Sequence, residues 1–233
     1  MQPPTSRRER LRAEALTEIK RLGMGQVAEG GPSALSLNAI AKQMGMSGPA
    51  IYRYFASRDD LLAALVVDAY EDLASALRKA LEQAARRTPE HRVRAVANAY
   101  RAWALEHAGT YPLLLTGGLA RGEQPLEIAA ASQGAMEPLL AALRDLPPGG
   151  DGPSARLPSR LAAQLTRWAR DRGADDQLPP WLLRLAVVTW QRMHGHIELE
   201  LEGVHAAMGL SSDALYRTEV DAIIAEATRA GTT

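Results

Sequence analysis

The chain contains no cysteine, and its apolar stretches are short. The absence of cysteine excludes a disulfide framework and any metal centre built on thiolates. We find no run of about 18 apolar residues, the length that a helix needs to span a membrane. The first residues are polar and then charged, unlike the apolar core of a secretion signal. We therefore expect a cytoplasmic protein that has no membrane partner.

Aromatic residues make up only 5% of the chain, with a single Phe, whereas Ala and Leu dominate a hydrophobic fraction of 46%. Ala and unbranched side chains lose little conformational freedom in a helix. We find no convincing pair of strands, so the sequence predicts an all-α fold. Glycine-rich phosphate loops and nucleophile elbows are also missing, and the five His residues leave few groups for metal or nucleophilic chemistry. We expect neither an enzyme nor a cofactor.

The formal net charge is zero, but the charges are unevenly spread. Residues 1–60 contain nine Lys or Arg and six Asp or Glu, whereas the remainder contains 18 and 21. A cationic N-terminal part followed by a slightly acidic body fits an anion-binding module joined to a larger domain. An excess this small has meaning only together with a motif.

Apolar residues at helical spacing predict seven to nine helices. We expect two domains, a helix-turn-helix module at 1–60 and a larger helical bundle at 61–233. A helix that starts at Ser57 connects them. Gly and Pro residues fill 147–157, which predicts a mobile loop. The other expected helices cover residues 6–28, a short one after Ser36, 47–54, 89–107, a short segment from Pro112, one or two within 126–146, one from Pro158, 181–202 and one from Ser211 or Ser212 to about Arg229.

Three residues have the spacing of a helix-turn-helix. Ala41 is small where the second helix crosses the first, Gly45 supplies the permissive backbone of the turn, and Ile51 fills the shared core. Such a unit places its second helix, here residues 47–54, in the major groove of DNA. The spacing alone also fits an ordinary helical hairpin.

The residues around this motif resemble the DNA-binding region of the tetracycline-repressor-like (TetR) family. The family pattern runs roughly T-x-x-x-I-A-x-x-x-G-V-S-x-x-x-x-Y-x-x-F-x-S-K-E-x-L. This chain follows it with four exchanges that keep the chemistry, namely Ser36 for Thr, Met46 for Val, Arg58 for Lys and Asp59 for Glu. The resemblance covers residues 7–65 and implies a ligand-responsive regulator of transcription, in most cases a repressor.

DNA recognition needs cations and amide donors for phosphates, side chains for base edges, and close apolar support. The resemblance implies that the arginines opening the first helix lie near the DNA backbone or minor groove, although a solvated terminus has the same composition. Small residues lead the recognition helix and permit close approach to the groove. For Tyr54, packing at the rim of the module is the alternative to a phosphate contact. The expected DNA-binding residues are Arg7, Arg8, Ser36, Ser47, Gly48, Pro49, Ala50, Tyr52, Arg53, Tyr54 and Arg58.

Polar aromatic residues gather in the C-terminal part. They suit a mostly apolar pocket with a few hydrogen-bonding groups, and they suit an ordinary helical core equally well. The sequence W-Q-R-M-H-G at 190–195 resembles a TetR subgroup whose C-terminal domain carries a Trp-His-Gly signature. We expect a partly apolar small-molecule effector, of unknown identity, to contact Tyr100, Trp103, His107, Tyr111, Trp190 and His194.

The first of the last two expected helices, 181–202, carries a pattern that resembles a metal site. The pairs His194/Glu198 and His196/Glu200 have ligand spacing, but such pairs are more often surface interactions and no third ligand accompanies them. We therefore expect no metal. Gly195 inside a helix is less favourable than Ala by about 1 kcal/mol. A close helix crossing would explain it, and we expect a homodimer formed through these two helices.

Two other classes of function stay open at this point. A helical protein-interaction module fits the composition but does not need the pattern from Tyr52 to Leu62. An enzyme fits less well, for the reasons given above. We predict a ligand-responsive, sequence-specific DNA-binding regulator with double-stranded operator DNA as its partner.

Overall fold

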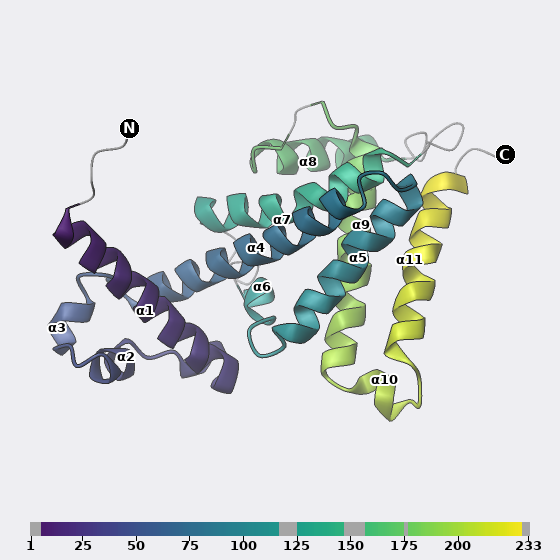
Figure 1. Cartoon of the computed structure of the whole chain (residues 1–233). Coiled ribbons are helices and arrows are strands. Elements are labelled where there is room, and N and C mark those ends of the chain that lie inside the picture. The colour runs from purple at the N-terminus through teal and green to yellow at the C-terminus, as the bar shows by residue number, and fades with distance from the viewer. Residues whose placement is uncertain (1–5, 117–124, 147–156, 175–176, 230–233) are drawn as a thin grey trace. The chain divides into compact units, whose positions relative to one another are not determined.

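The computed structural model describes residues 6–116, 125–146, 157–174 and 177–229 (Figure 1). Over these ranges the regular structure is helical and contains no strand, which confirms the all-α prediction. Within the described ranges, no helix combines the length and the hydropathy that a membrane span requires. The expected loop at 147–157 lies outside the described residues except for its last position, so its mobility stays a prediction.

The helices follow the predicted order, with two short elements that were not predicted, η1 and α10. The elements are α1 (Arg7–Gly30), η1 (Pro32–Ala34), α2 (Leu37–Gln43), α3 (Gly48–Ile51), α4 (Arg58–Gln83), α5 (Pro89–Glu106), α6 (Leu113–Thr116), α7 (Leu126–Arg144), α8 (Ser159–Arg170), α9 (Pro180–Leu201), α10 (Val204–Ala207) and α11 (Ser212–Arg229). The recognition helix is shorter than expected, because α3 ends at Ile51 and turns continue to Tyr54.

The chain divides into two compact units. The first, here called the N-terminal unit, comprises residues 1–69 and 107–128, and the second, the helical body, comprises 70–106 and 129–233. The chain passes between them within α4, after α5 and within α7. The predicted domain boundary near Asp60 falls inside α4 and stays a prediction.

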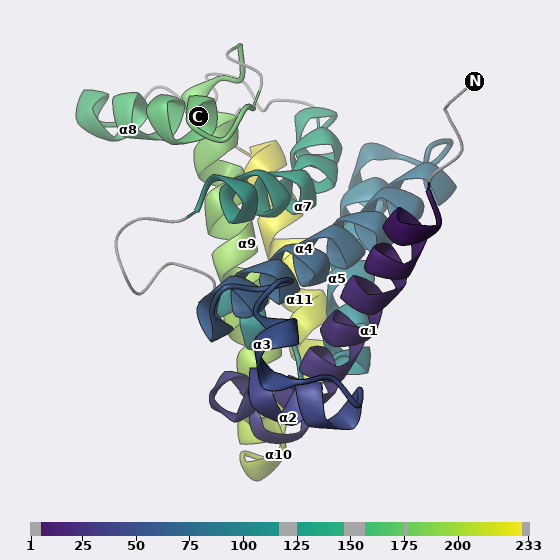
Figure 2. The same ribbon diagram turned by 90° about the vertical axis from the view of Figure 1, so that its left-hand side faces the viewer.

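The core of the N-terminal unit is aliphatic. Ile19 of α1, Ile40 of α2, Ile51 of α3 and Leu61 of α4 have no exposed surface. α1, α2 and α3 cluster together in both views (Figures 1 and 2). The Lys20 ammonium donates to the Asp68 carboxylate at 2.7 Å and so ties α1 to α4. This packing fixes the direction of α3.

α9 is the central helix of the body and packs against α5, α8, α10 and α11. Its buried face repeats at helical spacing through Ala186, Thr189, Met193 and Ile197. α11 runs beside α9 (Figure 1). The buried Tyr216 hydroxyl of α11 donates to the Ala97 carbonyl of α5 at 2.7 Å, so three long helices share one core.

Candidate nucleic-acid interface

The turn between α2 and α3 has the backbone that the sequence predicted. The Ser36 hydroxyl accepts a hydrogen bond from the Ala39 N–H at 3.3 Å, which confirms it as the cap of α2. Gly45 has φ of 65°, in the left-handed region that favours glycine. The Met46 N–H donates to the Ala41 carbonyl at 2.9 Å and closes the turn.

The predicted support beneath the recognition helix is also confirmed. Ala41 is 2% exposed and Ile51 is fully buried, while Phe55 belongs to the same buried set. These side chains hold α3 against α2. The polar residues between them are consequently left on the outer surface.

The leading end of α3 is small and open. Ser47 precedes the helix without using its hydroxyl as a cap, and Ser47 and Pro49 are exposed. A side-chain carbon added to Gly48 would meet nothing within 4 Å. Packing within the unit therefore gives no reason for a glycine here. A glycine is explained, however, if this surface has to approach another molecule closely.

A basic groove lies beside this surface. It is lined by residues of α1, of the turn between α2 and α3, of α3 and of the turns that follow α3. Four guanidinium groups border it, those of Arg7, Arg8, Arg12 and Arg53. None of the four forms an ion pair with a residue that the structure describes. The Arg12 guanidinium stacks over the Tyr54 ring at 5.3 Å. The remaining lining residues are Leu11, Met46, Ala50 and Tyr54.

The structure thus brings together most of the residues expected to touch DNA and adds one cation that was missed. Arg12 lies four and five residues after Arg8 and Arg7, so helical spacing on α1 was the signal that would have found it. The first turn of α1 is fixed by a reciprocal cap, in which the Ser6 N–H donates to Glu9 at 2.7 Å and the Glu9 N–H donates to Ser6 at 3.2 Å. Arg7 and Arg8 consequently start on a formed helix.

The two remaining expected contacts differ in their surroundings. Tyr52 is 47% exposed, so its ring points largely to solvent. Arg58, in contrast, donates through Nε to the Leu35 carbonyl at 3.1 Å, through Nη2 to the Pro32 carbonyl, and pairs with Asp59 at 3.1 Å. Its guanidinium holds the segment before α2 in place. A phosphate contact by Arg58 stays a prediction, and it requires sharing or breaking these bonds.

In the helical body, three of the expected effector residues form one cluster. The Tyr100 hydroxyl and His194 Nδ1 are 2.9 Å apart, and the Tyr100 ring stacks on Trp190 with centroids 4.8 Å apart. Burial lowers the pKa of His194. Trp103, one helical turn after Tyr100, donates its indole N–H to Asp72 at 2.7 Å. These contacts bring α4, α5 and α9 together.

The other two expected effector residues, His107 and Tyr111, belong to the N-terminal unit. Their segment lies directly on the end of α1, because a side-chain carbon on Gly109 would come within 2.6 Å of the Ala28 carbonyl oxygen. Tyr111 is fully buried and Thr110 is 8% exposed. The segment that follows α5 is therefore part of the unit that carries the helix-turn-helix.

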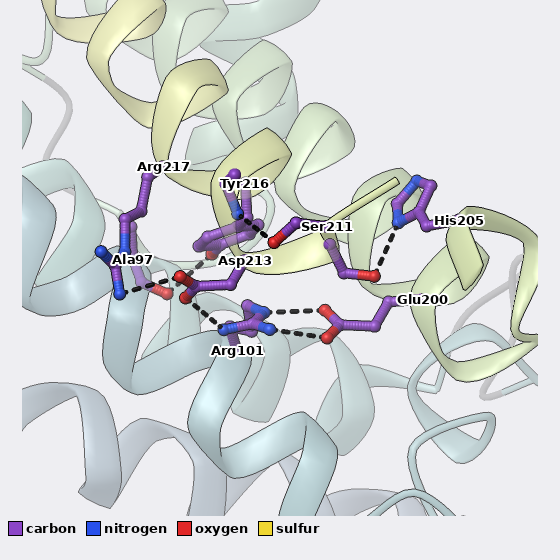
Figure 3. Close-up of polar contacts among 10 residues, drawn as sticks. Ala97, Arg101, Glu200, His205, Ser211, Asp213, Tyr216 and Arg217 are labelled. Carbon is purple, nitrogen blue, oxygen red and sulfur yellow. Dashed lines mark hydrogen bonds and ion pairs between the residues drawn. The ribbon is translucent and has the colours of Figure 1, made fainter. Parts of the chain in front are cut away.

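A charged network joins α5, α9 and α11 (Figure 3). Arg101 donates two hydrogen bonds to Glu200, at 2.7 and 2.6 Å, and a third to Asp213 at 3.2 Å. Asp213 also pairs with Arg217 at 2.8 Å. The Glu200 carboxylate raises the pKa of Arg101. The network holds the C-terminal helices in register.

These contacts also bear on the metal pattern of α9. Glu200 is hydrogen-bonded to Arg101, and the Nδ1 atom of His194 lies against the Tyr100 hydroxyl. Among the residues described, no group of three or more His, Asp or Glu side chains is arranged to hold a metal ion.

Two family models match the chain. One, described as "Bacterial regulatory proteins, tetR family", matches residues 22–65. The other, described as "Tetracyclin repressor-like, C-terminal domain", matches residues 93–223, more than half of the chain. The first covers the helix-turn-helix and the second covers most of the helical body. Membership of the Trp-His-Gly subgroup stays a prediction.

Curated relatives and a solved structure agree with these models. The HTH-type transcriptional regulator Mb1846 of Mycobacterium bovis is 40% identical over 103 residues, which span 44% of this chain and 44% of that protein. The uncharacterized HTH-type transcriptional regulator Rv0681 of Mycobacterium tuberculosis is 28% identical over 87% of this chain and 73% of its own length. The crystal structure of the regulatory protein SCO4313 is similar with a TM-score of 0.73 and 35% identity, covering 94% of this chain and 98% of that one.

Proposed function

The chain belongs to the TetR family of bacterial transcriptional regulators, a family of DNA-binding proteins and not of enzymes, and from this premise we propose that it is a cytoplasmic repressor. In this proposal it binds operator DNA as a homodimer and leaves the operator when a small molecule binds. The observation that carries the DNA part is the groove bordered by Arg7, Arg8, Arg12 and Arg53 beside the small, exposed leading end of α3.

The proposed docking follows from the sizes and charges of these groups. The leading residues of α3 are small enough for its backbone to approach base edges in the major groove. The arginines of α1 and Arg53 then face phosphates, where they replace counterions of the DNA. Tyr52 is exposed as well, and in this docking its hydroxyl donates to a phosphate. The Tyr54 ring lies under the Arg12 guanidinium and orients it.

Selection from random duplex DNA tests the proposal without knowledge of the operator. The purified full chain is mixed with a pool of duplexes, and bound DNA is recovered and sequenced over several rounds. We expect an inverted repeat, because a two-fold symmetric dimer needs matching half-sites. A pool that shows no enrichment at low salt would favour a protein-interaction module instead.

The effector is proposed to bind at the cluster of Tyr100, Trp190 and His194. The hydroxyl of Thr189, next to Trp190 on α9, is buried and has no hydrogen-bond partner among the described residues. Such a group is unfavourable by about 1–3 kcal/mol unless a ligand or water satisfies it. Trp190 stacks on Tyr100, so an effector that enters the cluster changes tryptophan fluorescence. His194→Ala is expected to reduce that change while DNA binding without effector is retained.

The homodimer is proposed to form through α9 and α11. Within one chain these helices already pack on each other, and Arg192 of α9 pairs with Glu219 and Glu226 of α11 at 3.5 and 2.9 Å. Gly195 is exposed on the side of α9 opposite the buried Met193, two residues before it, and a side-chain carbon there would meet nothing within 4 Å. This leaves a smooth helix face open for a second copy.

The coupling between effector and DNA is proposed to use two connections. α4 begins at the helix-turn-helix and continues into the body, as the sequence suggested. The segment that follows α5 is the second, because Gly109 contacts the end of α1. An effector lowers operator affinity only by its preference for one of the two arrangements, typically about 1–3 kcal/mol.

A further inference from the structure

A small hollow lies in the helical body on one face of α7. Five residues of this helix border it, Gln133, Glu137, Leu140, Ala141 and Arg144, at the spacing of a single helical face. Its volume is about 290 Å³, just below the usual range for ligand pockets, so it suits a small molecule. It shares no residue with the cluster around Tyr100.

The opposite wall comes from three described residues between α8 and α9. Gly173, Ala174 and Leu178 supply it. Gly173 has φ of 74°, in the region that favours glycine, and the Ala174 N–H donates to the Ala169 carbonyl at 3.0 Å. This turn fixes Gly173 and Ala174 at the end of α8, where both border the hollow.

Polar side chains that border the hollow are available to a ligand. The Oε1 atom of Gln133 is buried, and no donor among the described residues reaches it. Glu137 and Arg144 are exposed, and neither forms an ion pair with a residue in the described ranges. They are seven residues apart, which is about 10 Å along a helix. Leu140 lies between them and offers apolar surface.

We propose that this hollow binds a small zwitterion with an ammonium group at one end, a carboxylate at the other and an apolar chain between. The ammonium donates to Gln133 Oε1 and pairs with Glu137, while the carboxylate pairs with Arg144. Leu140 and Leu178 cover the apolar chain. The site is a second one, separate from the proposed effector cluster, and it does not depend on DNA binding.

Three probes of equal chain length test the proposal by calorimetric titration of the full chain. 6-Aminohexanoate carries both charges, hexanoate only the carboxylate, and hexylamine only the ammonium. We expect 6-aminohexanoate to bind about two- to fivefold more tightly than either singly charged probe, the equivalent of one partly exposed ion pair.

Substitutions at two exposed residues test which end of the ligand each residue binds. Arg144→Gln should remove the advantage of 6-aminohexanoate over hexylamine, and Glu137→Gln should reduce its advantage over hexanoate, because Gln133 still accepts from the ammonium. Arg160→Gln on α8, exposed and outside the hollow, is the matched control and should change nothing. Equal binding of the three probes, undetectable binding of 6-aminohexanoate, or equal effects of Arg160→Gln and Arg144→Gln would overturn the proposal.

Discussion

Arginine is the residue type on which the proposed DNA contact depends, and the chain uses it in two ways. Arg58 and Arg101 are held by intrachain acceptors, and Arg101 is only 19% exposed. Arg12 instead lies in the basic groove, where its guanidinium packs against the face of Tyr54. A guanidinium in that position remains available to a phosphate, because an aromatic face does not use its N–H donors.

Replacing Arg12 with Ala should weaken operator binding about tenfold, because one charge-assisted hydrogen bond to a phosphate is lost. The slope of log affinity against log salt concentration should become shallower by about 1. Fluorescence anisotropy at several salt concentrations measures both. Arg21→Ala is the control, since Arg21 is also on α1 but pairs with Glu18 away from the groove. Equal effects of the two substitutions would contradict the proposal that the basic groove contacts DNA.

His194 makes stability depend on pH. Burial lowers its pKa in the folded chain below that of the unfolded chain, about 6.5. The unfolded chain therefore binds more protons below that value, and stability is full above it and falls as pH decreases through the folded pKa. Thermal unfolding between pH 8 and pH 5, in about four steps, should show this loss. The loss should be smaller in His194→Gln, whereas the exposed His91→Gln should retain the wild-type profile.

At the scale of elements, the 107–111 segment lies so close to α1 that a single substitution tests the contact. A side-chain carbon on Gly109 would lie 2.6 Å from the Ala28 carbonyl oxygen and 3.0 Å from its Cα, and both are backbone atoms. Gly109→Ala should therefore destabilise the chain by about 1–3 kcal/mol. Gly134→Ala, inside α7 with open space around it, should instead stabilise by about 0.5–1 kcal/mol. Denaturant unfolding measures both.

The same contact makes Gly109 a test of coupling. If α1 shifts to accommodate the methyl group, operator affinity in Gly109→Ala should change even without effector. A variant with reduced stability but wild-type affinity for the operator, measured well below its unfolding temperature, would argue that this segment does not transmit the signal.

The helices that the sequence predicted well are those with long apolar periodicity and clear caps. α9 and α11 were expected at 181–202 and to about Arg229, and the Ser211 hydroxyl caps α11 by accepting from the Ala214 N–H at 3.2 Å. The end of α3 was placed too late, because Tyr52 to Tyr54 keep helix-forming composition while the chain already turns. η1 and α10 are single turns, too short to leave a periodic pattern.

The candidate site was predictable where local sequence decides geometry. Ser36, Gly45 and Ile51 act in the turn and core as expected. Long-range contacts were not predictable, since the acceptors of Arg58 lie 23 and 26 residues earlier in the chain. For the same reason, the sequence grouped His107 with Trp103, four residues before it, although the structure assigns them to different units.

At the scale of the whole molecule, the dimer is the property that most needs a test. Gly195→Leu should weaken self-association by about tenfold or more, because overpacking at a helix crossing is unfavourable by about 1–3 kcal/mol. Gly25→Leu is the matched control, since Gly25 is an exposed helical glycine on α1 with open space around it. Analytical ultracentrifugation measures both. A wild-type dissociation constant for Gly195→Leu would place the interface elsewhere.

The central claim is that two copies of this chain read an inverted repeat through α3 and the basic groove. The most direct measurement is anisotropy titration of the selected inverted-repeat duplex against a duplex of equal length in which one half-site is scrambled. We predict two chains per intact duplex, affinity that falls steeply with salt, and binding weaker by about a hundredfold or more once a half-site is lost. Equal affinity for the two duplexes, or one chain per intact duplex, would contradict the account.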